Sequence, residues 1–248
     1  MQRLGLIGGT GLDHWGPAIR THKVDSQYGH PSAELAEYQQ GDLQLFFLPR
    51  HGKHHKIPPH AVNYRANIDS FRQLEVEAVI AVNAVGGISR KNQPGSLTIP
   101  DQLIDYTWGR AHTFSMTSDD ILQHTEFAGP FDGPLRSALI QAAVAACIDV
   151  TDGGCIGVSQ GPRLETSAEI GRFMQDGCDM VGMTSMPEAA LAREAGLDYA
   201  SLCINANWAA GLTEEPVSME AIEATLAGAM VRVREILAIC FEEFCHAS

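Results

Sequence analysis

The chain has 248 residues, enough to bury a sizeable hydrophobic core as one large α/β domain or two small ones. Its 17 basic and 30 acidic residues give a formal net charge of −13, which argues against a nucleic-acid partner and against binding to an anionic membrane surface. No apolar run approaches the roughly 20 residues of a membrane helix.

The six cysteines form no C-x-x-C pair, and several lie in apolar runs, as reduced core thiols do. A strand-like stretch begins at Arg3, which leaves no room for a signal peptide. We therefore expect a cytoplasmic protein with reduced cysteines.

Short apolar runs alternate with segments of helical periodicity along the chain. Strands are predicted at Leu4–Ile7, Leu43–Leu48, Ala78–Val82, Cys155–Val158, Met180–Met183 and from Tyr199 onward. Helices are predicted over Val62–Leu74, Leu135–Cys147, Ser167–Met174, Glu188–Ala195 and Ser218–Cys245. This alternation predicts an α/β fold, and because no stretch resembles a linker, one domain over residues 1–248 is favoured.

Glycines or polar residues follow nearly every predicted strand, where ligands bind in sheets of this kind. Gly8–Gly11 contains Thr10 and offers backbone amides to a phosphate, although a simple tight turn is the alternative. It is not a dinucleotide fingerprint, because His14 stands where the third glycine belongs. Arg50 and His51 follow the second strand, and this pair suits an oxyanion, although a solvated Arg50 is the alternative.

The segment Tyr199–Trp208 delivers two carboxamides, Asn205 and Asn207. Residues two apart on a strand share a side, so both are expected to contact the same ligand. A carboxamide donates and accepts hydrogen bonds, which suits it to the edge of a heterocyclic base. The alternative is that both residues only punctuate a loop.

Four histidines cluster at positions 51, 54, 55 and 60. Their spacing fits no zinc pattern, and Pro58–Pro59 breaks any shared helix face. We therefore expect no metal site here, and interpret this segment as a loop over a ligand site.

Gly157–Gly161 matches G-x-S-x-G, the nucleophile elbow of α/β-hydrolases, with Ser159 as the nucleophile. The only histidine after Ser159 is His246, third from the end of the chain and a poor candidate for a precisely held base. A serine hydrolase is therefore a minor alternative. A non-catalytic nucleotide-binding module is another.

From Gly5 through the closing helix the chain closely resembles the trimeric nucleoside phosphorylases, a family that contains purine nucleoside phosphorylase and 5′-methylthioadenosine phosphorylase. The resemblance rests on motifs in the family's order, namely Gly8–Gly11, Pro49–Gly52, Asn83–Gly87, Gly161–Glu165 and Met183–Glu188. It implies a single-domain phosphorylase-type α/β fold, with a mixed central β-sheet flanked by helices, and a homotrimer. It also implies inorganic phosphate and a purine nucleoside as substrates, with no cofactor and no metal.

Site residues follow from the resemblance, position by position. Phosphate is expected to contact Thr10, Arg50, His51, Ala84 and Thr184. Met183 is expected against the ribose, with Leu164 (where the family usually has Phe) and Glu165 at the base. His124 corresponds to a residue that reaches the neighbouring subunit's site.

Two departures from the family pattern bear on the substrate. Methylthioadenosine phosphorylases carry Asp-x-Asp where this chain has Asn205 and Asn207. A carboxylate suits a 6-amino group, whereas an amide can donate to a 6-oxo oxygen and accept from N7–H, while Glu165 accepts from N1–H. We therefore expect a 6-oxopurine, with Asn205 as the principal base-contacting and catalytic residue beside His51, and Asn207 orienting it.

The second departure lies at the 5′ end of the ribose. Purine nucleoside phosphorylases place a histidine near the start of the last helix, but no histidine occurs between His124 and His246. Met219 and Ile222 stand there and would bury a methylthio group. The expected reaction is phosphorolysis of S-methyl-5′-thioinosine to hypoxanthine and 5-methylthioribose 1-phosphate. Inosine, guanosine and methylthioadenosine are the alternative substrates.

Overall fold

The computed structural model describes residues 2–116, 124–214 and 217–246. The strands are β1 (Gln2–Gly8), β2 (Arg20–His22), β3 (Leu35–Gln40), β4 (Leu43–Pro49), β5 (Ala78–Gly87), β6 (Leu97–Ile99), β7 (Gln102–Asp105), β8 (Val150–Asp152), β9 (Cys155–Val158), β10 (Met180–Gly182) and β11 (Asp198–Trp208). The α-helices are α1 (Tyr64–Gln73), α2 (Pro134–Ala145), α3 (Ser167–Gln175), α4 (Ser185–Glu194) and α5 (Met219–His246). Two short 3₁₀ turns, η1 (Pro59–Ala61) and η2 (Arg90–Asn92), complete the described elements.

The strands form one mixed sheet, as predicted. Its main path runs β2-β3-β4-β1-β5-β10-β9-β7, and β11 pairs with both β5 and β6. Strand β1 is parallel to β4 and β5, and β11 is parallel to β5, so the carboxyl ends of these four strands lie at one edge. Strand β10 crosses the end of β5 in the antiparallel sense and brings the segment after Gly182 to the same edge.

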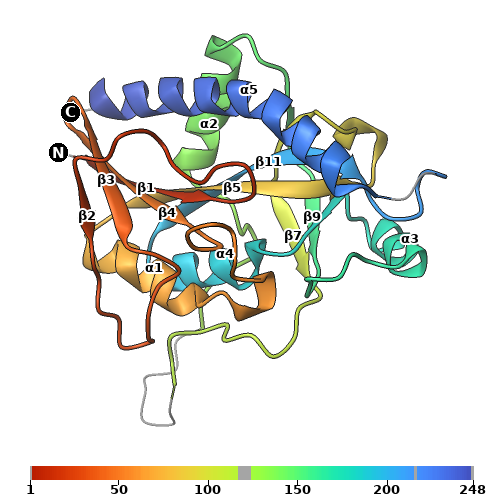
Figure 1. The fold of residues 1–248 in the computed structure, drawn as a ribbon, viewed down its shortest axis with the longest axis horizontal. Helices are drawn as coiled ribbons and strands as arrows, with labels where there is room; N and C mark the ends of the chain where they lie inside the picture. The colour runs from red at the N-terminus through yellow and green to blue at the C-terminus, as the bar shows by residue number, and fades with distance from the viewer. Residues whose placement is uncertain (1, 117–123, 215–216, 247–248) are drawn as a thin grey trace.

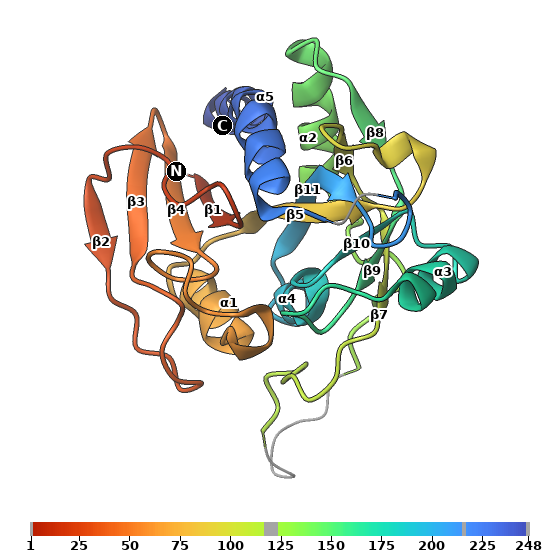
Figure 2. The same ribbon diagram turned by 45° about the vertical axis from the view of Figure 1, so that its right-hand side comes forward.

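Helices cover both faces of the sheet, as Figures 1 and 2 show, with α2 and α5 on one face and α1 and α4 on the other. Alternation along β5 divides its side chains between the two layers. Ile80 and Val82 pack in the cluster that includes residues of α2 and α5. Val79 and Ala81 pack in the cluster that includes Phe71 of α1.

The predicted elements occur in the predicted order, but two strands are longer than expected. β5 continues through Asn83–Gly87, and β11 continues through Asn207 to Trp208. The two strands pair along this extension, which keeps their polar residues within the sheet. Asn83 Nδ2 donates to Ser201 Oγ at 2.7 Å across the strand pair. The buried carboxamide of Asn83 therefore has a hydrogen-bond partner inside the sheet.

None of the described helices is both long enough and apolar enough to cross a membrane. One sheet connects all the described strands, and a single domain over residues 1–248 stays a prediction.

Candidate active site

A cavity of about 400 Å³ opens at the edge where the parallel strands end. Its size suits a small organic ligand, since ligand sites range from about 300 to 1,000 Å³. Eleven of the residues predicted for the site line it: Thr10, Arg50, His51, Ala84, Leu164, Glu165, Met183, Thr184, Asn207, Met219 and Ile222. Two predicted residues, Asn205 and His124, do not line it in this chain.

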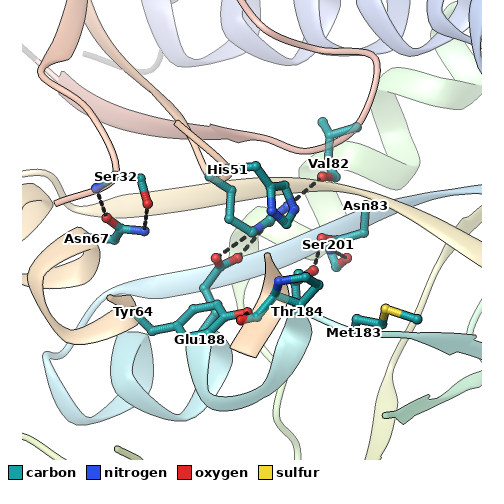
Figure 3. A network of polar contacts seen from close by, with 12 residues as sticks. Ser32, His51, Tyr64, Asn67, Val82, Asn83, Met183, Thr184, Glu188 and Ser201 are labelled. Atoms are coloured by element: carbon teal, nitrogen blue, oxygen red, sulfur yellow. Dashed lines mark hydrogen bonds and ion pairs between the residues drawn. The ribbon is translucent and has the colours of Figure 1, made fainter. Parts of the chain in front are cut away.

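Arg50 is held by a buried ion pair at the end of the cavity where phosphate is predicted to bind. Its Nε and Nη2 donate to the carboxylate of Glu188 at 2.7 and 2.8 Å, and Nη1 donates to the carbonyl of Val82 at 3.2 Å (Figure 3). The hydroxyl of Tyr199 donates a hydrogen bond to the same carboxylate at 2.8 Å. Burial disfavours the charge, but Glu188 outweighs it and raises the pKa of Arg50 above its usual value. Arg50 is therefore a fixed, fully charged donor.

Thr184 belongs to a second polar chain at this end (Figure 3). Its hydroxyl donates to Asn83 Oδ1 at 3.1 Å, and Asn83 in turn donates to Ser201. Both Asn83 and Ser201 are buried, so they hold Thr184 in place from behind. Thr10 also lines the cavity, and its Oγ1 lies 3.4 Å from His55 Nε2.

His51 is neutral in this environment. Its Nδ1 donates to the carbonyl of Ile57 at 2.8 Å, which leaves Nε2 as the acceptor of the neutral ring. Burial, reinforced by the charge of Arg50, lowers the pKa of His51 to about 4, although the bond to Ile57 opposes the shift. The ring of His55 lies 4.4 Å from that of His51.

The loop that carries these histidines contributes more of the site than the sequence indicated. His55, Lys56, Pro58 and Pro59 all line the cavity, and none of them was singled out as a ligand-contacting residue. The cluster of histidines was the sequence feature that could have marked this loop as part of the site. No group of three or more His, Cys, Asp or Glu side chains that could hold a metal ion occurs within residues 2–116, 124–214 and 217–246.

Glu165 forms the acidic part of the opposite wall. The hydroxyl of Ser159 donates to Glu165 Oε1, which fixes the carboxylate and leaves Oε2 as an acceptor for a hydrogen bond from a ligand. This contact also disfavours the serine hydrolase, because the Ser159 hydroxyl is hydrogen-bonded to Glu165 and not to a histidine base. The side chain of His246, the suggested base, lies outside the described residues.

The two carboxamides of β11 do not both line the cavity, although alternation along the strand predicted that they would lie on one side. A β-bulge interrupts the pairing with β5 between Asn205 and Asn207, so the expected alternation does not carry both side chains into the cavity. Asn205 is fully buried, and its Nδ2 donates to Ser96 O, Ser96 Oγ and Thr98 Oγ1 at 3.0 to 3.2 Å. Asn207 lines the cavity instead. Its Nδ2 donates one proton to Trp208 O at 2.6 Å, which leaves a second N–H and Oδ1 for a ligand.

The remaining wall is apolar. Val217, Met219 and Ile222 line it at the start of α5, with Ile222 buried and Met219 61% exposed. Met183 lines the neighbouring part of the cavity. His124 is exposed and does not line the cavity of its own chain.

Known proteins match this chain over most of its length. Residues 3–242 match the model of the phosphorylase superfamily. A probable S-methyl-5′-thioinosine phosphorylase from Xanthomonas campestris pv. campestris is 50% identical over 210 residues, which cover 84% of each chain. A protein with the same description from Pseudomonas syringae pv. tomato is 45% identical over 235 residues, covering 94% of this chain and 96% of its own.

The fold agrees with these matches. A structure of methylthioadenosine phosphorylase from Schistosoma mansoni in complex with adenine superposes with a TM-score of 0.92 and 34% identity, over 98% of this chain and 92% of that one. Sequence, fold and the cavity at the strand ends lead to one assignment. The chain belongs to the phosphorylase superfamily and is a pentosyltransferase of the nucleoside phosphorylase type.

Proposed function

We propose that this chain catalyses the phosphorolysis of S-methyl-5′-thioinosine to hypoxanthine and 5-methylthioribose 1-phosphate, as its relatives' descriptions indicate for them. The observation that carries the proposal is the pairing, within one cavity, of a base end formed by Glu165 and Asn207 with an apolar wall formed by Val217, Met219 and Ile222. The first favours a 6-oxopurine, and the second favours a 5′ substituent without a hydroxyl.

At the base end, each polar group has a partner on a 6-oxopurine. Glu165 Oε2 accepts from N1–H, because Ser159 occupies Oε1. The free N–H of Asn207 donates to O6, and Oδ1 accepts from N7–H as the leaving base gains a proton. A 6-amino base offers no acceptor at position 6, so the same arrangement leaves a donor unpaired. Asn205 does not contact the base in this arrangement, and its hydrogen bonds to Ser96 and Thr98 fix the strand that carries Asn207.

At the 5′ end, the methylthio group packs against Met219 and Ile222. Burying a methyl and a sulfur here favours the ligand by roughly 1–3 kcal/mol, whereas a 5′-hydroxyl would lose its water without a partner.

At the phosphate end, we place the anion against Thr10, Arg50, His51, Ala84 and Thr184, with Met183 under the ribose. Phosphate attacks C1′ as the glycosidic bond breaks, and its negative charge stabilises the cation-like ribosyl group. The neutral His51 accepts a hydrogen bond from a protonated phosphate oxygen through Nε2. Electrons of the broken C1′–N bond pass to the purine, which takes up a proton from solvent at N7, while hydrogen phosphate gives up one proton as its oxygen bonds to C1′. Asn207 stabilises the leaving base. No covalent enzyme intermediate and no cofactor take part.

We further propose that the active form is a cytoplasmic homotrimer, in which His124 reaches the ribose of a neighbouring subunit. This rests on the family resemblance and on the exposure of His124 away from its own cavity. Sedimentation analysis tests the assembly, and a monomer with full activity would contradict it.

The experiment for the substrate compares phosphate-dependent release of free base from methylthioinosine, inosine and methylthioadenosine under matched conditions. The proposal expects the highest kcat/KM on methylthioinosine. A higher kcat/KM on methylthioadenosine would refute the selection of a 6-oxopurine by Glu165 and Asn207. A higher kcat/KM on inosine would refute the selection of a methylthio group by the apolar wall.

A further inference from the structure

Arg110 makes an unusual set of contacts for a residue that lies outside the cavity lining. Its Nη1 donates to the carbonyls of Met183 and Met186 at 2.9 and 2.5 Å, and reaches the Tyr64 hydroxyl at 3.4 Å. Its Nη2 donates to the carbonyl of Gln160 at 2.8 Å, and its Nε donates to the Gln160 side chain at 3.1 Å. All of these acceptors are neutral oxygens, so the guanidinium is used as a fork of donors and not as half of an ion pair.

The carbonyls belong to two chain segments that continue into different parts of the cavity lining, one through Met183 and Thr184 and the other through Leu164 and Glu165. Met183 lines the cavity and is followed directly by Thr184 at the proposed phosphate end. Gln160 stands next to Ser159, which holds Glu165 at the base end. The side chain of Arg110 therefore connects the backbone of the ribose–phosphate wall to the backbone of the base wall.

The segment that follows Arg110 is held by α4. Glu194, near the end of that helix, accepts from the backbone N–H of Phe114 at 3.1 Å and from the Thr113 hydroxyl at 2.8 Å. The guanidinium also lies over the ring of Tyr64, 5.5 Å from its centroid. Burial lowers the pKa of Arg110, so holding this cation away from water costs free energy that its hydrogen bonds offset.

We propose that Arg110 is a positioning residue that sets the separation between the base wall and the ribose–phosphate wall. This inference rests on the proposed nucleoside phosphorolysis, because a nucleoside is the ligand that spans both walls. Free hypoxanthine contacts the base wall alone, and free phosphate contacts the other wall alone. Loss of Arg110 should therefore impair the nucleoside reaction far more than it impairs binding of either fragment.

The test uses Arg110→Met, which keeps the length of the side chain without its donors, and Arg110→Lys, which keeps the charge without the fork. For Arg110→Met we expect kcat/KM for the nucleoside to fall about 100-fold, since a displacement near 1 Å of the reacting groups has that effect. The dissociation constants of hypoxanthine and of phosphate, measured separately by calorimetry, should change less than about threefold. Arg110→Lys should recover part of the activity.

Arg136→Met is the matched control. Arg136 also donates to backbone carbonyls of another segment, Ile99 at 3.1 Å and Pro100 at 2.9 Å, but lies outside the cavity lining. It should keep kcat/KM within about threefold of the unmodified enzyme, even if its melting temperature falls as much as that of Arg110→Met.

Two outcomes would overturn the inference. One is kcat/KM of Arg110→Met within threefold of the unmodified enzyme. The other is a loss of hypoxanthine and phosphate binding in step with kcat/KM, which would indicate a general role in folding. The assay uses whichever nucleoside the unmodified enzyme cleaves fastest, so a wrong substrate assignment would show in the unmodified enzyme and leave the test of Arg110 intact.

Discussion

Replacing Asn207 with Asp tests which carboxamide contacts the base. The substitution removes the N–H that we assign to O6 and places a carboxylate oxygen against that carbonyl. An unmade hydrogen bond at a partly buried charged group costs about 3 kcal/mol, or roughly 100-fold in kcat/KM for methylthioinosine. The carboxylate can accept from a 6-amino group, and a charge-assisted bond of about 1.5–3 kcal/mol should raise kcat/KM for methylthioadenosine about tenfold or more.

Asn205→Asp is the matched comparison. Its Nδ2 donates to three oxygens, and one of them, Ser96 O, cannot donate in return. A buried carboxylate at this place should lower the free energy of unfolding by about 3–5 kcal/mol, as when a buried charge is left without a partner. Because Asn205 lies outside the cavity lining, the ratio of kcat/KM on the two nucleosides should change less than about threefold.

The assay follows base release from both nucleosides at saturating phosphate, together with urea unfolding of each variant. A shift of about 1,000-fold in the ratio for Asn207→Asp, with a nearly constant ratio for Asn205→Asp, is the expected result. If Asn205→Asp moves the preference and Asn207→Asp does not, the assignment of the base-contacting residue made here is wrong.

Three further predictions concern the other parts of the cavity. Ile222→Thr places a hydroxyl in the apolar wall of the cavity. In parallel assays the ratio of kcat/KM for methylthioinosine to that for inosine should fall about tenfold. An unchanged ratio would exclude Ile222 from the 5′ site. Glu188→Gln leaves the buried guanidinium of Arg50 without its carboxylate partner. The free energy of unfolding in urea should therefore fall by about 3–5 kcal/mol, and the KM for phosphate should rise. Unchanged values of both would contradict the role of this ion pair. The pKa of His51 is about 4 in the folded protein and returns to its ordinary 6.5 in the unfolded chain. Between these two pH values the unfolded chain binds a proton that the folded protein does not. The free energy of unfolding therefore falls as the pH drops from 6.5 to 4. His51→Gln should reduce this fall by about 3 kcal/mol in phosphate-free buffer, and an equally steep curve would count against a neutral His51.

The order of the strands and helices was predictable because apolar periodicity and glycine-rich strand ends are local signals. The position of Arg50 and His51 at the cavity was also predictable, since both directly follow a strand and need only its direction to reach that edge of the sheet. The different positions of Asn205 and Asn207 were not, because the β-bulge after Asn205 depends on how β11 pairs with β5 and on acceptors supplied by Ser96 and Thr98.

The contacts of Glu188 and Arg110 could not be predicted from the sequence for a related reason. Glu188 was expected as the first residue of a helix and as the end of the motif Met183–Glu188, but with no partner named, and it pairs with Arg50, 138 positions earlier in the chain. The acceptors of Arg110 are mostly backbone carbonyls, which carry no signature in the residue types of their segments.

We propose that the cavity selects both a 6-oxopurine and a 5′-methylthio group. This selectivity is measured as kcat/KM of the unmodified enzyme for phosphate-dependent base release from methylthioinosine, inosine and methylthioadenosine, assayed side by side. We expect kcat/KM for methylthioinosine to exceed that for inosine by about 10- to 200-fold and that for methylthioadenosine by about 100-fold or more. Equal or greater activity on either of the other two nucleosides would contradict it.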